Sequence, residues 1–113
     1  MTEDQLQAQC FQWFWNTYPA HRRKLWAVPN GGSRGLKEAT KFKATGVVAG
    51  VHDLHLYHDH QLYTFELKVG NNKLSPDQIT WKVTMEREGA MCYEIRTFEA
   101  FQQAITAVID GHK

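Results

Sequence analysis

The 113-residue sequence has few of the features that mark exported or membrane proteins. It contains only two cysteines, Cys10 and Cys92, too few for a disulfide framework, and we expect both to be reduced thiols. No apolar run approaches the ~20 residues that a membrane-spanning helix needs. The first residues, MTEDQLQ, lack the basic and apolar regions of a signal peptide. These absences predict a cytoplasmic protein that does not associate with membranes.

The sequence also has little net charge, +1, but the charge is unevenly distributed. Residues 21–43 carry seven Lys and Arg against one Glu, which leaves a net charge of −5 on the rest of the chain. A basic segment on a nearly neutral protein suits a nucleic-acid backbone, although a solvated loop and helix face would have the same composition. The length and the 42% hydrophobic content predict one globular domain, residues 1–113.

Start and stop signals divide the chain into alternating elements. Thr2 and Gln5 have the spacing of a capping box before an apolar helical stripe that Pro19 ends, and Ser75 with Gln78 repeats the pattern before a helix that ends near Gly89. Between and after them the sequence predicts a short strand from residue 25, a short basic helix over 36–46, a hairpin over 47–70, a strand over 90–96 and a helix after residue 97. The order α-β-α-β-β-α-β-α predicts an α/β or α+β fold.

The hairpin brings charged residues together on one face. If Asp59 and His60 form a two-residue turn, Asp53 lies directly opposite Glu66 on the neighbouring strand. Opposed side chains share a face about 5 Å apart at Cβ, and Lys68, two residues after Glu66, points to the same side. A slip by one residue would move Asp53 to the other face, so this prediction depends on the turn.

Two carboxylates so close together repel unless a cation neutralises them. Magnesium binds one or two carboxylates together with waters and phosphate oxygens, and it activates water for attack on a phosphate. A neighbouring lysine can hold the water or the phosphate. The alternative is a solvent-facing strand with an ordinary Glu–Lys pair.

Several spaced motifs resemble the VRR-NUC nucleases, a branch of the PD-(D/E)XK superfamily. They are PNGGSRG, KATGVVAGVHDL, FELKV, LSPDQ and CYEIR, and the resemblance runs from about Glu3 to Phe101. It implies a restriction-endonuclease-like α/β core with a central mixed sheet flanked by helices. It also implies cleavage of DNA phosphodiester bonds that depends on Mg²⁺ or Mn²⁺. One departure is His52, which stands where the superfamily name has Pro.

The resemblance assigns roles residue by residue. Asp53, Glu66 and the backbone carbonyl of Leu67 would bind the metal, and Lys68 would be the catalytic lysine. Glu3 would point at the site from the first helix, although a first-turn acid also suits the helix dipole. Gln78 has a family counterpart near the site and equally fits the capping box.

Candidate DNA contacts are concentrated in the basic segment. The glycines of PNGGSRG permit close backbone approach, and an arginine beside them can bind a phosphate through two donors. Lysines in the next segment would extend the phosphate contacts, and one more precedes the helix after the hairpin. The predicted DNA-binding residues are Asn30, Gly31, Gly32, Arg34, Lys37, Lys41, Lys43 and Lys73.

The run HDLHLYHDH suggests zinc at first sight. Strand alternation places His52, His58 and His60 on one face and His55 on the other with Asp53, and no cysteine is adjacent, so a zinc site is not expected. His55 would then lie on the face of the predicted magnesium site.

The short chain resembles viral and bacterial members of the family that are similar to Holliday junction resolvases. This likeness implies a homodimer acting on branched or duplex DNA in the cytoplasm of a bacterial or phage-infected cell. The alternatives are a non-catalytic DNA-binding domain with this fold and a protein-interaction module.

Overall fold

The computed structural model describes residues 1–29 and 44–111. The elements are α1 (Glu3–Thr17), the 3-10 helix η1 (Pro19–Lys24), β1 (Leu25–Ala27), β2 (Leu54–His58), β3 (Gln61–Leu67), α3 (Pro76–Arg87), β4 (Met91–Ile95) and α4 (Phe98–Asp110). The predicted order is confirmed for these elements, and η1 is an addition that the sequence analysis did not predict. The helix predicted over residues 36–46 falls largely outside the described residues.

Helix starts follow the predicted caps. Thr2 Oγ1 accepts a hydrogen bond from Gln5 N at 3.1 Å, and Thr2 N donates to Gln5 Oε1 at 2.8 Å, which completes a capping box. Ser75 and Gln78 form the same pair of bonds at the start of α3. These reciprocal bonds satisfy backbone donors that a helix start leaves free.

In the described residues the sheet has the order β1-β2-β3-β4, antiparallel except for the parallel pair β3–β4. The hairpin has the predicted register, because Leu54 pairs with Phe65 and His58 with Gln61. Asp59 and His60 both have positive φ, 51° and 65°, as a two-residue type I′ turn requires. The mixed sheet flanked by helices confirms the predicted fold class.

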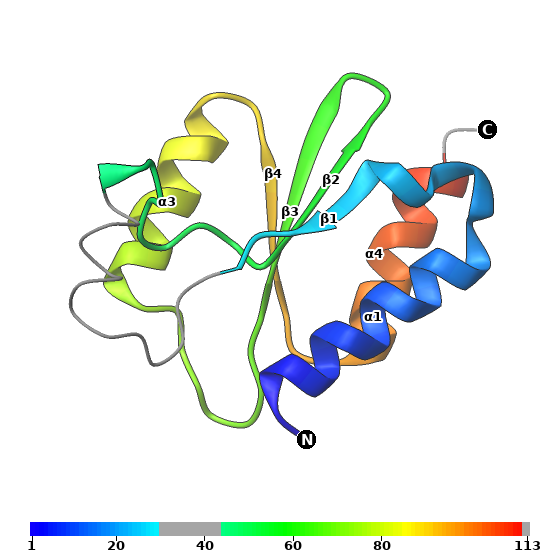
Figure 1. Ribbon diagram of the computed structural model, residues 1–113, viewed down its shortest axis with the longest axis horizontal. Helices are drawn as coiled ribbons and strands as arrows, with labels where there is room; N and C mark the ends of the chain where they lie inside the picture. Colours follow the sequence, from blue (N-terminus) through cyan, green and yellow to red (C-terminus); the bar gives the residue numbers. More distant parts are fainter. Residues whose placement is uncertain (30–43, 112–113) are drawn as a thin grey trace.

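The sheet separates two unlike layers (Figure 1). α1 and α4 cover one face, where Phe14, Phe65 and Phe101 are fully buried in an apolar core. α3 covers the other face, where the buried side chains of β3 are Thr64 and Glu66. One side of the sheet therefore stabilises the fold by apolar burial, and the other side holds polar groups.

Trp81 of α3 covers this polar face by packing on two histidine rings. The Trp81 ring centroid lies 4.8 Å from that of His52 and 5.4 Å from that of His55. His52 is fully buried, with its Nδ1 3.0 Å from Thr64 Oγ1. The prediction that His52 and His55 point to opposite faces is therefore wrong. β2 begins only at Leu54, so strand alternation does not extend back to His52.

Cys10 and Cys92 are both free thiols. Burial raises the pKa of Cys10 to about 12, so this thiol packs as an apolar side chain of α1. None of the helices in the described part of the chain is long and apolar enough to cross a membrane.

Candidate active site

The three residues predicted from the hairpin lie together at the end of the polar face. Asp53 immediately precedes β2, Glu66 lies near the end of β3, and Lys68 follows β3. Glu66 is 2% exposed and Lys68 is 8% exposed. Lys68 Nζ is 3.9 Å from Glu66 Oε2, which places both on one face as the alternation predicted.

Backbone hydrogen bonds hold Asp53 on both sides. Asp53 Oδ2 accepts a hydrogen bond from Leu67 N at 2.9 Å, so its carboxylate reaches across the hairpin. Its backbone carbonyl accepts from Val28 N at 2.9 Å, just beyond β1. Burial raises the pKa of Asp53 above its ordinary range, and the bond from Leu67 N opposes that rise.

Glu66 is the most strongly perturbed carboxyl group of the site. Burial first, and then the negative charge of Asp53, raise the pKa of Glu66 from 4.5 to about 8. The positive charge of Lys68 acts in the opposite direction. Glu66 Oε2 accepts a hydrogen bond from Gln78 Nε2 at 3.1 Å, whereas Oε1 is buried and has no partner among the described residues. A buried acceptor without a donor is uncommon in folded proteins and often marks a functional site.

Gln78 reaches Glu66 because of the capping box of α3. Its Oε1 accepts from Ser75 N at 2.8 Å, which leaves Nε2 free to donate to the carboxylate. The capping and active-site interpretations of Gln78 are therefore compatible, because one amide group makes both contacts.

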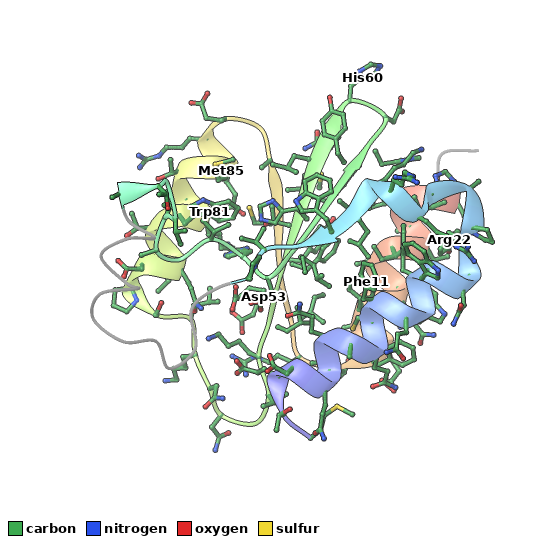
Figure 2. All side chains as sticks on the ribbon, in the orientation of Figure 1. Phe11, Arg22, Asp53, His60, Trp81 and Met85 are labelled. Carbon is green, nitrogen blue, oxygen red and sulfur yellow. The ribbon has the colours of Figure 1, made fainter. Side chains whose placement is uncertain are left out.

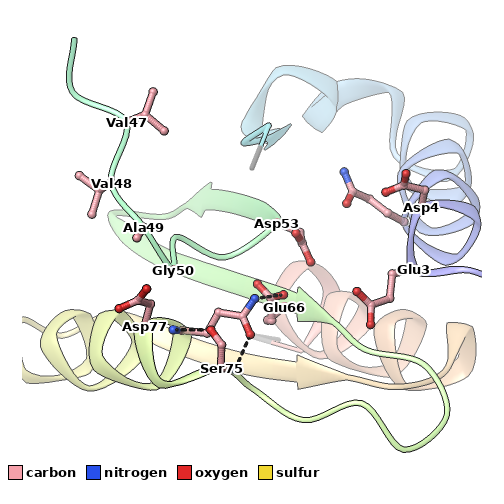
Figure 3. A pocket seen from close by; sticks show the side chains of 12 residues that line it. Glu3, Asp4, Val47, Val48, Ala49, Gly50, Asp53, Glu66, Ser75 and Asp77 are labelled. Carbon is pink, nitrogen blue, oxygen red and sulfur yellow. Dashed lines mark hydrogen bonds between the residues drawn. The ribbon is translucent and has the colours of Figure 1, made fainter. Parts of the chain in front are cut away.

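Carboxylates surround a cavity of about 470 Å³ in front of this pair, which we call the acid pocket. Figure 3 shows the carboxylates of Glu3, Asp53 and Glu66 facing the same space. The lining residues are Glu3, Asp4, Gln7, Val47, Val48, Ala49, Gly50, Asp53, Glu66, Ser75, Asp77 and Gln78. His55 is not among them, and its ring lies against Trp81.

Glu3 is held in the pocket wall by the loop between β3 and α3. Asn72 Nδ2 donates to Glu3 Oε2 at 2.9 Å. Arg96 holds the loop, since its Nη1 donates to Gly70 O at 3.1 Å and its Nη2 donates to Asn72 O at 2.6 Å. The Nε of Arg96 donates to Glu94 Oε2 at 2.7 Å, which orients the guanidinium group. The end of β4 is thus linked to the first turn of α1 through one loop.

Gly50 allows the opposite wall to approach α3. Its φ is +84°, and a Cβ at this position would collide with the backbone carbonyl of Asp77 in the first turn of α3. The residues that precede Asp53 therefore lie directly against the turn that carries Gln78. Only glycine permits both this backbone conformation and this approach.

The donor set fits a hard divalent cation. Asp53 and Glu66 offer carboxylate oxygens, and magnesium binds one or two carboxylates and keeps several waters. Oε1 of Glu66 has no partner among the described residues, and the pKa values of Asp53 and Glu66 are both raised. A bound positive charge would give that oxygen a partner and would favour the ionised form of both carboxyl groups. No group of three or more His, Cys, Asp or Glu side chains suited to a metal occurs among the described residues. Water and phosphate oxygens would therefore complete the coordination.

Most predicted DNA-binding residues lie outside the described part of the chain. These are Asn30, Gly31, Gly32, Arg34, Lys37, Lys41 and Lys43. Lys73 is described and exposed, in the loop before α3. The described lining of the acid pocket includes five acids and no Lys or Arg, so phosphate binding there requires cations from outside that lining.

Sequence reasoning missed Asn72, Arg96 and Gly50 as residues that shape the pocket. The hydrogen bond from Arg96 to Asn72 joins residues that are 24 positions apart in the chain, and nothing in the local sequence pattern indicates that contact. Gly50 offers only the general signal that glycine permits close backbone approach, which does not single it out from the other glycines of the chain.

The fold is shared with a solved protein structure. No family model matches the sequence, and no curated protein matches it. A solved structure of a "VRR_NUC domain protein" superposes with a TM-score of 0.79 at 24% sequence identity. The alignment covers 97% of this chain and 89% of that chain. The chain therefore has the VRR_NUC domain fold, which supports the resemblance predicted from its motifs.

Proposed function

We propose that this protein is a metal-dependent endonuclease of the VRR-NUC type that hydrolyses phosphodiester bonds in DNA. The observation that carries the proposal is the pair of half-buried Asp53 and buried Glu66 in the lining of an open pocket, with Lys68 Nζ 3.9 Å from Glu66 Oε2. Two carboxyl groups with raised pKa values destabilise the free protein, so their presence requires another reason.

In the proposed mechanism the chain positions the reacting groups. Asp53, Glu66 and the carbonyl of Leu67 would hold one Mg²⁺ or Mn²⁺ ion. When bound, such an ion neutralises the carboxylates, lowers the pKa of water and stabilises charge on the phosphate. Lys68 holds the attacking water or a non-bridging phosphate oxygen. The water oxygen attacks phosphorus in line and gives up a proton to solvent, the opposite P–O bond breaks, and the leaving oxygen takes up a proton from solvent.

The remaining residues of the site support this arrangement. Gln78 fixes the Glu66 carboxylate through its 3.1 Å hydrogen bond. Glu3, held by Asn72, adds negative charge at the rim and assists in binding hydrated cations. Lys73 and the basic segment 30–43 are proposed to contact the DNA backbone. We further propose that the protein acts in the cytoplasm, as a homodimer on branched DNA, because a four-way junction presents two symmetric cuts.

Cleavage of labelled DNA tests the proposal directly. A four-way junction and a matched linear duplex are incubated with Mg²⁺ or Mn²⁺ and with the wild type, Asp53→Asn or Lys68→Ala. Asp59→Asn and Lys82→Ala serve as controls, because Asp59 lies in the hairpin turn and Lys82 makes a surface pair with Glu86. We expect cleavage by the wild type and both controls and its loss in both site variants.

The two substrates distinguish nuclease activity from specificity for a junction. Paired symmetric cuts in the junction alone support a dimeric, junction-specific enzyme. Cleavage of the duplex at an equal rate supports the nuclease and refutes junction specificity. DNA binding without metal-dependent cleavage of either substrate would contradict the nuclease and favour a non-catalytic DNA-binding domain.

A further inference from the structure

His52 is a buried polar side chain that the proposed mechanism does not use. It immediately precedes Asp53 in the chain, it is fully buried, and it is not part of the lining of the acid pocket. A neutral imidazole has one donor and one acceptor nitrogen, and burying them costs free energy unless both find partners. An apolar side chain would fill the same space without this cost, so the role of His52 depends on what its ring contacts.

Three elements meet at the His52 ring. Nδ1 lies 3.0 Å from Thr64 Oγ1 on β3, and the ring centroid lies 4.8 Å from that of Trp81 on α3. Burial lowers the pKa of His52 to about 4, so the ring is neutral near pH 7, and a hydrogen-bond contact with the backbone of Gln78 acts in the opposite direction. Nε2 is buried and has no other partner among the described residues. Figure 2 shows Trp81 on the side of the sheet that α3 covers, where Asp53 is also labelled.

Each of these three elements also carries one group of the acid pocket. Asp53 is the next residue of the segment that contains His52. Glu66 follows Thr64 by two positions, so both side chains lie on one face of β3. Gln78, whose backbone meets the ring, also donates to Glu66 Oε2 at 3.1 Å. The His52 ring therefore lies directly behind the place where the two carboxylates and the amide come together.

The segment before Asp53 meets the first turn of α3 at two points. Gly50 approaches the backbone carbonyl of Asp77, and His52 contacts the backbone of the next residue, Gln78. The backbone of His52 is itself held, because its carbonyl accepts a hydrogen bond from His55 Nε2 at 3.2 Å. The glycine permits the approach of the two segments, whereas the histidine supplies directional contacts that define their relative position.

We propose that His52 is a positioning residue that holds the first turn of α3 so that Gln78 Nε2 reaches Glu66 Oε2 beside Asp53. His52 does not touch the substrate or the metal in this scheme, and it acts through Gln78. Its effect on metal binding and cleavage rests on the proposed function, whereas its effect on the Gln78 side chain does not. Residues that orient metal ligands from behind typically change metal affinity or activity about 10- to 100-fold when they are replaced.

The side-chain amide signal of Gln78 in a ¹⁵N-correlated NMR spectrum tests the proposal in EDTA, without metal or DNA. In the wild type this amide bonds both Ser75 N and Glu66 Oε2, so its protons should exchange slowly with water. His52→Phe keeps a ring to pack on Trp81 but removes both nitrogens, and we expect it to abolish that protection. His52→Gln, whose amide reaches the place of Nε2, should restore part of it.

Two more variants make this measurement specific. Thr64→Val has nearly the same shape but removes the hydroxyl partner of His52 Nδ1, so it should weaken the protection of Gln78 in the same direction. His58→Phe makes the matched change at the opposite end of β2, where the ring contacts His21, and should leave the Gln78 signal unchanged. Wild-type exchange at Gln78 in both His52→Phe and Thr64→Val would overturn the proposal.

The affinity for Mn²⁺, measured by isothermal titration calorimetry at a temperature where all variants are folded, provides a second test. We expect His52→Phe and Gln78→Ala each to weaken binding about tenfold. Because His52 acts through Gln78, the double variant should bind Mn²⁺ no more weakly than Gln78→Ala alone. Two additive losses, or a lower Tm for His52→Phe with wild-type affinity, would refute the positioning role.

Cleavage assays distinguish this inference from the proposed function. If His52→Phe releases Gln78 and weakens Mn²⁺ binding but the wild type cuts no DNA, the positioning role stands and the nuclease is refuted. If the wild type cleaves DNA and His52→Phe has the same kcat and the same exchange at Gln78, the nuclease stands and the positioning role is refuted.

Discussion

The charge state of Glu66 leads to a prediction that needs no DNA. Folding raises the pKa of Glu66 from 4.5 to about 8, because the carboxyl group is buried and faces Asp53. The folded protein therefore retains this proton between pH 4.5 and 8, whereas the unfolded chain loses it. Where the folded state binds more protons, stability falls as pH rises. A shift of this size corresponds to at most about 5 kcal/mol, fully expressed above pH 8.

Replacing Glu66 by glutamine removes the group that resists ionisation but keeps its shape. The new amide can still accept the hydrogen bond from Gln78 and can donate to Asp53. In EDTA we expect Glu66→Gln to be more stable than the wild type by about 2–4 kcal/mol at pH 8.5 and nearly equal to it at pH 4.5. For a chain of this size that gain corresponds to a rise in Tm of about 10–20 °C.

Thermal unfolding followed by circular dichroism at both pH values measures the difference. Glu88→Gln, an exposed residue at the end of α3, is the control and should change Tm by only a few degrees at either pH. Adding Mg²⁺ at pH 8.5 should stabilise the wild type but not Glu66→Gln, since a ligand stabilises only the state that binds it. The electrostatic argument would be wrong if Glu66→Gln were no more stable than the wild type at pH 8.5. It would also be wrong if the substitution changed Tm by the same amount at both pH values.

Two further predictions concern the walls of the acid pocket. Gly50→Ala should lower the free energy of unfolding by about 2–4 kcal/mol, because the new methyl group collides with the first turn of α3. Gly89→Ala has a similar φ of +99° in open space and should cost only about 1 kcal/mol, so equal losses in urea denaturation would contradict the steric argument. Arg96→Ala and Asn72→Ala should each reduce kcat about tenfold by releasing Glu3. Arg96→Lys should restore part of kcat, and a change confined to KM would count against a positioning role.

The acid pocket has a consequence for how DNA binds. Glu3, Asp4, Asp53 and Asp77 line the pocket near the place proposed for a phosphate, and Glu66 adds a further negative charge when it ionises. Divalent cations and basic residues from outside the described lining must offset that charge before a phosphodiester can enter. We therefore expect DNA affinity at the pocket to increase with Mg²⁺.

The local elements of this fold were predictable because short-range chemistry determines them. The caps at Thr2 and Ser75 depend on residues three positions away, and both capping boxes are present. The turn at Asp59 and His60 determines the register of the hairpin, which pairs Leu54 with Phe65 and leaves Asp53 one residue beyond the last pair, with its carboxylate bonded to Leu67 N. The predicted carboxylate pair therefore follows from one turn and strand alternation.

Contacts between distant segments were not predictable in the same way. Strand alternation failed at His52 because the chain bends before β2, and the ring meets Trp81 instead. The η1 helix, with its basic residues, has no apolar periodicity that marks it in advance.

The sequence by itself therefore determined the order of the elements, the register of the hairpin and the carboxylate pair with its lysine. Each depends on neighbours within a turn, a helix start or one strand pair. Only the tertiary structure decided that Asn72 holds Glu3 and that Arg96 holds the loop that carries Asn72. These features depend on how α1, the sheet and the loop after β3 pack in space, and no local pattern encodes that packing.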